Sequence, residues 1–149
     1  MIKVTSDCDP SLNAPNIKYL KKIVNNIFVT KKIKEAELSY VFCDDAFLSK
    51  LKQEFFNKNH FTDVIAFRLN SSKETKIEGE IYISLPRAKE NSTIFNEPYE
   101  KEVARLIIHG CLHLIGYLDK TKNQKKEMNK QEKMFLDNLL WFNLFENYE

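Results

Sequence analysis

The chain has 149 residues, of which 43% are hydrophobic and 30% are charged, a composition typical of a globular domain in water. No run approaches the roughly 18 consecutive apolar residues of a membrane span, so we expect neither a membrane protein nor a membrane partner. The net charge of +2 is too small to predict nucleic-acid binding by itself.

The cysteines and the first residues bear on the compartment. Cys8, Cys43 and Cys111 are odd in number, widely spaced and form no CxxC pair, which favours a reducing compartment over a disulfide-linked fold. Residues 1–7 lack the apolar stretch of a signal peptide. We therefore expect a cytoplasmic protein.

Hydrophobic spacing predicts alternating strands and helices in the first half of the chain. Strands are expected at residues 2–5, 37–42, 62–67 and 80–85. The first helix is expected to start at Pro15, which suits a first helical turn, and to run to about Thr30. A second helix begins at Asp44-Asp45, and a polar connection at residues 73–76 joins the last two strands.

The second half is expected to be helical. A short helix runs from Pro86 to Glu90, a second begins at Pro98 and carries two histidines, and a long helix spans about residues 123–145. The apolar stripe of that last helix is expected to be core and comprises Met128, Met134, Phe135, Leu139, Leu140 and Phe142. This order predicts an α+β (mixed α/β) fold in a single domain, residues 1–149, with a small mixed sheet of about four strands packed against helices.

The most informative segment is residues 109–119, His-Gly-Cys-Leu-His-Leu-Ile-Gly-Tyr-Leu-Asp. His109 and His113 are four residues apart on an apolar helix, so they share one face and can bind the same ion. Gly116 offers a turn out of the helix, after which Asp119 can swing back to complete a three-ligand site. Catalytic zinc typically has three protein ligands and one open position. Metal binding at the end of a buried helix is therefore the leading hypothesis.

Two histidines on one helical face can instead be core residues bonded to backbone carbonyls. Three features favour a metal. The apolar residues 103–108 lead His109 into an interior where an unpaired imidazole is costly. Two of the three glycines lie within residues 109–119, and His60 is the only other histidine. Cys111 faces another side of the helix, and we interpret it as a buried cysteine.

The histidine spacing is that of the HExxH metalloproteases, but Gly110 stands where those enzymes carry the glutamate general base. Ordinary proteolysis of this type is therefore not expected. Bound zinc still polarises an oxygen without that glutamate, so hydrolysis of an electrophilic centre remains compatible with the motif.

The 109–119 segment resembles the signature H-G-x-L-H-L-x-G-Y-D-H of the YbeY family of bacterial metal-dependent endoribonucleases. Residues 62–67, Thr-Asp-Val-Ile-Ala-Phe, are similar to the T-D-V-L-S-F strand of that family, and residues 79–84 match a G-D-I-x-I-S strand. Met128 and Glu132 fit a spaced Met and Glu on the last helix. The histidine signature is the specific part of this resemblance.

The resemblance implies a cytoplasmic, single-strand-specific endoribonuclease that acts in 3′-end maturation of the small-subunit (16S) ribosomal RNA and in ribosome quality control. The implied partners are single-stranded RNA, ribosomal RNA and the ribosome. One Zn²⁺ ion is then expected on His109, His113 and Asp119, while the general base and the oligomeric state stay unassigned.

Two positions depart from the family pattern. Asp119 stands where the third ligand is usually histidine. A carboxylate can ligate zinc, but an anion lowers the net charge of the site, so we expect weaker Lewis acidity and weaker attraction for phosphate. Phe55-Phe56 stand where the family has Tyr-Arg, so the arginine implicated in the family's chemistry is missing from its slot.

Asp63 and Arg68 are the candidate substrate-binding residues. Arg68, Arg87 or a lysine can replace the missing positive charge, and no spacing argument selects one; an arginine just past a strand is more often a surface residue. Asp63 either lines the cleft or bonds local backbone amides. Phosphate binding or a solvated helix face are the two interpretations of the lysines after the motif, namely Lys120, Lys122, Lys125, Lys126, Lys130 and Lys133.

Two other functions stay open. One is a metallohydrolase that acts on peptides or small molecules and leaves single-stranded RNA intact. The other is a ribosome-associated binding module whose metal is purely structural and fully coordinated by protein.

Overall fold

The computed structural model describes residues 1–56 and 62–146, and within them the chain forms a four-stranded sheet and five α-helices. The strands are β1 (Ile2–Cys8), β2 (Ala36–Cys43), β3 (Val64–Arg68) and β4 (Ile77–Ser84). The helices are α1 (Ile17–Thr30), α2 (Asp45–Phe56), α3 (Leu85–Ile94), α4 (Tyr99–Ile115) and α5 (Lys122–Asp137), followed by a 3₁₀ turn at Trp141–Asn143.

The sheet has the strand order β1-β2-β4-β3. Strands β1, β2 and β4 are parallel, whereas β3 runs antiparallel to β4 at one edge. The predicted α+β (mixed α/β) class with a small mixed sheet is therefore confirmed. His60 lies outside the described residues. Among the described helices, none combines the length and the apolar character needed to cross a membrane.

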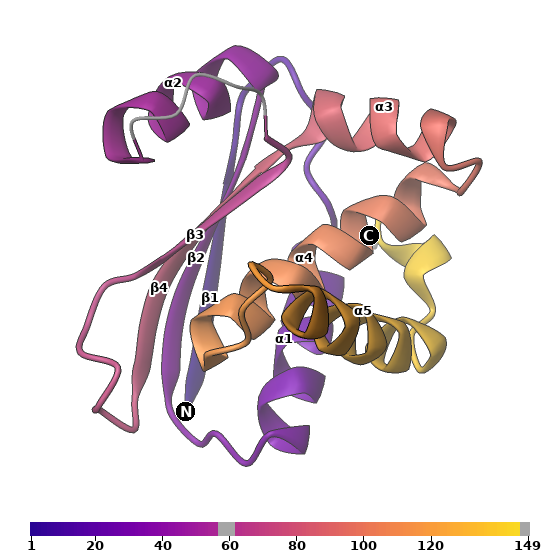
Figure 1. Ribbon diagram of the computed structural model, residues 1–149. Helices are drawn as coiled ribbons and strands as arrows, with labels where there is room; N and C mark the ends of the chain where they lie inside the picture. Colours follow the sequence, from indigo (N-terminus) through magenta and orange to yellow (C-terminus); the bar gives the residue numbers. More distant parts are fainter. Residues whose placement is uncertain (57–61, 147–149) are drawn as a thin grey trace.

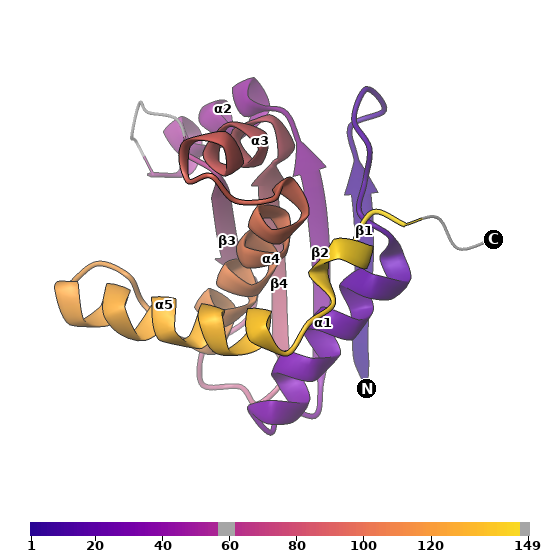
Figure 2. The same cartoon turned by 90° about the vertical axis from the view of Figure 1, so that its right-hand side faces the viewer.

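Helices α1 and α4 lie over one face of the sheet, and α5 packs against α4 (Figures 1 and 2). Side chains alternate along the strands, so Leu38, Tyr40 and Phe42 of β2 are buried beneath these helices. Helix α2 covers part of the opposite face, where Phe67 contacts the rings of Phe55 and Tyr82. The main core thus lies between the sheet and the α1–α4 layer, with α4 at its centre.

Two glycines let α4 approach β4 closely. A Cβ atom on Gly110 would lie 2.6 Å from Cγ2 of Ile81, and one on Gly79 would lie 2.5 Å from Cδ1 of Leu114. Both positions exclude a larger residue unless a neighbour moves. The third glycine, Gly116, has φ of +123°, a conformation that side chains rarely adopt. Each glycine therefore stands where close packing or backbone geometry requires it.

Several predicted boundaries are shifted. Strand β4 begins at Ile77 rather than residue 80, and Leu85 belongs to α3. The Ser84 side chain accepts a hydrogen bond from the Arg87 amide and so caps α3 at its N-terminus. Pro15 lies just before the true N-cap of α1, which is Asn16.

The predicted helix over residues 123–145 is wrong in its second part. Helix α5 ends at Asp137, and the chain then turns back so that Leu144 is fully buried and its carbonyl accepts a hydrogen bond from the Asn16 amide. Of the predicted stripe, Met128 and Phe135 are buried. Exposed instead are Met134, Leu140 and Phe142.

Candidate metal centre

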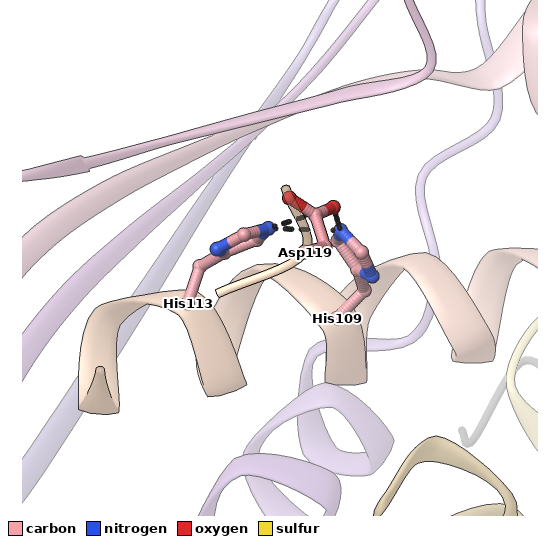
Figure 3. A group of neighbouring side chains, drawn as sticks. All are labelled: His109, His113 and Asp119. Atoms are coloured by element: carbon pink, nitrogen blue, oxygen red, sulfur yellow. Dashed lines mark hydrogen bonds and ion pairs between the residues drawn. The ribbon is translucent and has the colours of Figure 1, made fainter. Parts of the chain in front are cut away.

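The end of α4 and the loop after it bring three potential ligands together. His109 and His113 lie one turn apart near the C-terminus of α4. The helix stops at Gly116, whose amide donates to the carbonyls of Leu112 and His113, and the loop that follows carries Asp119 back over the helix. Figure 3 shows the two imidazole rings and the carboxylate converging from these two elements.

The start of α5 fixes the other end of this loop. The Thr121 side chain accepts a hydrogen bond from the Gln124 amide, and the Gln124 side chain accepts from the amides of Lys120 and Thr121. This arrangement is a capping box, which satisfies backbone donors that the helix leaves free. Asp119 is therefore held between a helix end and a helix start.

The three ligand atoms form a nearly equilateral triangle. Nε2 of His109 lies 3.0 Å from Nε2 of His113, and each lies 3.3 Å from Oδ2 of Asp119. Ligand atoms of a tetrahedral zinc ion, each about 2.0–2.1 Å from the metal, lie roughly 3.3 Å from one another. Two imidazole nitrogens and one carboxylate oxygen are also a donor set that zinc accepts. The residues present therefore fit one zinc ion.

The centre lies at the edge of the core rather than inside it. The exposed fraction of the side chain is 14% for His109, 26% for His113 and 39% for Asp119. Burial lowers the pKa of His113, and the neighbouring His109 adds to this effect while Asp119 opposes it. A lowered pKa favours the neutral imidazole, which is the form that binds metals.

A buried carboxylate orients the first histidine. Nδ1 of His109 lies 2.5 Å from Oε2 of Glu132 on α5, and only 4% of the Glu132 side chain is exposed. An Nδ1–H that donates to this carboxylate leaves Nε2, the atom of the triangle, free for a metal. Met128 and Phe135 lie on the same buried face of α5 as Glu132, so helical spacing indicates that this carboxylate is buried but not which residue it contacts.

Arg105 connects Glu132 to two further carboxylates, Glu102 and Asp63. Its guanidinium donates to both oxygens of Glu102, at 2.7 and 2.9 Å, and to Oε1 of Glu132 at 3.3 Å. It also lies 3.7 Å from Asp63. Burial acts to lower the pKa of Arg105, but the hydrogen bonds and charges of its carboxylate partners raise it above the usual value. Sequence reasoning missed Arg105 and Glu102. The two lie three residues apart on α4, but Glu132 and Asp63, which Arg105 also contacts, come from distant parts of the chain.

The structure places Asp63 beside this cluster. Its Oδ2 accepts a hydrogen bond from Asn91 of α3 at 3.1 Å, so the side chain is directed towards α3 and α4 rather than the local backbone. Asp63 and Asn91 line a hollow of about 240 Å³ together with Thr62 and Arg87. A contact of Asp63 with substrate stays a prediction.

The Arg68 side chain is bound by the β3–β4 loop and by the end of α4. Its guanidinium donates to the Asn70 side chain and to the carbonyl of Leu114 near the end of α4. Three more bonds reach the carbonyls of Ser71, Glu74 and Lys76. These five bonds favour a structural role, and substrate binding by Arg68 stays a prediction.

The remaining candidates for chemistry are Arg87 and two buried cysteines. Arg87 pairs with Asp45 of α2 at 2.6 Å and with Glu90 of α3 at 3.2 Å. Cys111 is fully buried, as expected, and burial raises its pKa well above the usual thiol value. Burial likewise raises the pKa of Cys43 to about 12. A thiolate nucleophile is therefore not available at either position.

Comparisons with known proteins identify the family of this chain. The family model of endoribonuclease YbeY matches residues 6–140. An endoribonuclease YbeY from Karelsulcia muelleri is 43% identical over 100 residues, which cover 67% of this chain and 70% of the relative. An endoribonuclease YbeY from Amoebophilus asiaticus is 34% identical over 128 residues, which cover 86% of each chain.

A solved structure shares the fold. The solution structure of a protein from Thermotoga maritima superposes with a TM-score of 0.60 and 28% sequence identity, and the match covers 92% of this chain and 87% of that one. The fold and the site define a small α+β domain with three potential metal ligands at the end of a buried helix and in the loop that follows it. The chain belongs to the YbeY endoribonuclease family.

Proposed function

We propose that the chain is a metal-dependent endoribonuclease that hydrolyses phosphodiester bonds of single-stranded RNA. The observation that carries this proposal is the triangle of ligand atoms, with edges of 3.0 and 3.3 Å, at a partly exposed helix end. The relatives reported above bear the name endoribonuclease YbeY. In this proposal, residues 1–149 act as one metallo-endoribonuclease domain.

The proposed metal is one Zn²⁺ ion held by His109, His113 and Asp119. When bound, it supplies a Lewis acid that stabilises negative charge on the phosphodiester in the transition state. Glu132 keeps His109 in the tautomer whose Nε2 faces the ion. The general base is unassigned, and Asp63 and Arg68 are the proposed substrate contacts.

The lysines of α5 are proposed to position the RNA backbone. The helix begins three residues after Asp119, and its five lysines are all exposed. They are Lys122, Lys125, Lys126, Lys130 and Lys133. Phosphate contacts of this kind fix the register of a nucleic acid without reading its bases, which suits an enzyme that does not select a sequence.

We propose the biological setting from the family to which the chain belongs. The substrate is then the 3′ end of the small-subunit (16S) ribosomal RNA, the partner is the ribosome, and the compartment is the cytoplasm. This setting is testable with a 16S precursor fragment, because cleavage at its mature 3′ end is expected from the wild type and not from a metal-free sample.

The decisive experiment compares RNA cleavage by zinc-loaded wild type and His113→Ala, with chelator and zinc-readdition controls. Single-stranded RNA is expected to be cut by the wild type alone, with loss on chelation and recovery on readdition. Elemental analysis of both proteins gives the metal content. Cleavage by both proteins, or by neither, would contradict the proposal and favour the binding module, whereas hydrolysis of peptides or small molecules alone would favour the metallohydrolase.

A further inference from the structure

Arg105 lies one helical turn before His109 on α4, and its contacts reach carboxylates on three different segments. Glu102 belongs to the same helix, Glu132 belongs to α5, and Asp63 precedes β3. Of the Glu102 and Glu132 side chains, only 4% is exposed in each case. Arg105 is therefore the cation that two buried carboxylates share.

We propose that Arg105 is a positioning residue of the metal centre, which holds the Glu132 carboxylate in the orientation that accepts a hydrogen bond from His109. This inference rests on the proposed metal centre and goes beyond it. Arg105 acts on the ligand through Glu132.

The two oxygens of Glu132 have different partners, and this fixes the rotation of the carboxylate. Oε1 lies 3.3 Å from Nη1 of Arg105, and Oε2 lies 2.5 Å from Nδ1 of His109. Loss of the first partner leaves a buried carboxylate free to turn towards another donor. Since Glu132 is almost fully buried, water does not readily replace the guanidinium.

Glu102 aims the guanidinium at Glu132. It accepts two hydrogen bonds, from Nε and Nη2 of Arg105, which fix the plane of the guanidinium and leave Nη1 directed at Glu132. Asn91 closes the cluster, because its Nδ2 donates to both Asp63 and Glu102. A lysine has one nitrogen and no fixed fork, so it is not able to keep both carboxylates in place.

The alternative is that Arg105 only neutralises Glu102, its neighbour at i−3. A double-mutant cycle on zinc affinity separates the two roles. The dissociation constant for Zn²⁺ is measured by competition with a chromophoric chelator for the wild type, Arg105→Gln, Glu132→Gln and the double variant. The visible absorption of bound Co²⁺ reports the geometry of the ligands. Lys101→Gln is the matched control, because Lys101 lies on the same helix and pairs with Glu97.

Both single variants are expected to bind zinc roughly 10-fold more weakly or worse, the range for residues that orient metal ligands. The double variant is expected to bind no more weakly than Glu132→Gln alone, because Arg105 acts through Glu132. Lys101→Gln is expected to stay within about twofold of the wild type. An unchanged affinity for Arg105→Gln, or additive losses in the double variant, would overturn the inference.

Two further measurements keep the result unambiguous. If Arg105→Gln does not fold, Arg105→Lys keeps the charge beside Glu102 but lacks the fork, and it is expected to bind zinc more weakly than the wild type; equal affinity would overturn the inference. A wild type that binds no zinc overturns the metal centre and this inference together. A wild type that binds zinc without cleaving RNA overturns only the proposed activity, since the affinity cycle still decides the role of Arg105.

Discussion

Gly110 of α4 lies directly over Ile81 of β4, so closely that a Cβ atom on the glycine would be 2.6 Å from Cγ2 of Ile81. Gly110 is also the residue after His109. The packing of the helix on the sheet and the position of the first proposed ligand are therefore set by the same contact.

Gly110→Ala is expected to destabilise the protein by about 1–3 kcal/mol, because overpacking forces side chains or backbone to shift. Urea unfolding of metal-free protein measures the change. The double variant Gly110→Ala/Ile81→Ala is expected to lose less stability than the sum of the two single variants. Gly116→Ala is the matched control, since its strain comes from a positive φ, and Ile81→Ala is not expected to relieve it. Additive losses at Gly110 would contradict the packing argument.

Asp119→His is expected to speed phosphodiester cleavage and to move the rise of the pH–rate profile to lower pH. A neutral ligand leaves more positive charge on the site, and this strengthens its Lewis acidity and its attraction for phosphate. Rates of single-stranded RNA cleavage across pH measure both effects. Asp119→Asn serves as a comparison, because it also removes the charge but is a poorer ligand. Identical profiles for the wild type and Asp119→His would argue against the charge effect.

Replacing three lysines of α5 is expected to weaken binding of single-stranded RNA about tenfold or more at low salt. The variants are Lys122→Gln, Lys126→Gln and Lys130→Gln combined, and the slope of log affinity against log salt is expected to flatten by roughly 0.7 for each phosphate that the protein no longer neutralises. Fluorescence anisotropy with a chelated, inactive sample measures binding apart from cleavage. A triple change of exposed α1 lysines, Lys18, Lys21 and Lys22, removes the same charge elsewhere. Equal weakening in both triple variants would mean that only net charge matters.

The stability of the metal-free protein is expected to fall as the pH is lowered from about 7.5 to about 5.5, partly through His113. Its pKa is lower in the folded state than in the unfolded chain, so the unfolded chain binds more protons over this range. His113 therefore contributes a loss of stability that begins near the unfolded pKa and is complete below the folded one. His113→Gln is expected to reduce the difference in unfolding free energy between the two pH values. An unchanged difference would show that His113 is not titrating in this window.

The proposed ligands could be predicted from the sequence because they depend on local geometry. His109 and His113 are related by one helical turn, and Gly116 marks the place where the chain leaves the helix. The order of strands and helices along the chain follows from hydrophobic spacing in a similar way. These features can be recognised from a few neighbouring residues of the sequence.

The support of the centre could not be predicted in this way. His109 and Glu132 are 23 positions apart, and they meet only because α5 packs on α4. The end of α5 was also missed, because the apolar residues continue beyond Asp137 while the chain leaves the helix to bury Leu144. Helical periodicity does not distinguish a stripe that continues from a segment that turns back to the core.

The third proposed ligand is the one member of the centre that no helix contains. Position 119 contributes to the backbone hydrogen bonds of neither α4 nor α5, whereas an exchange at His109 or His113 alters a packed helix. The donor on this loop is thus the position at which metal preference can evolve independently of folding.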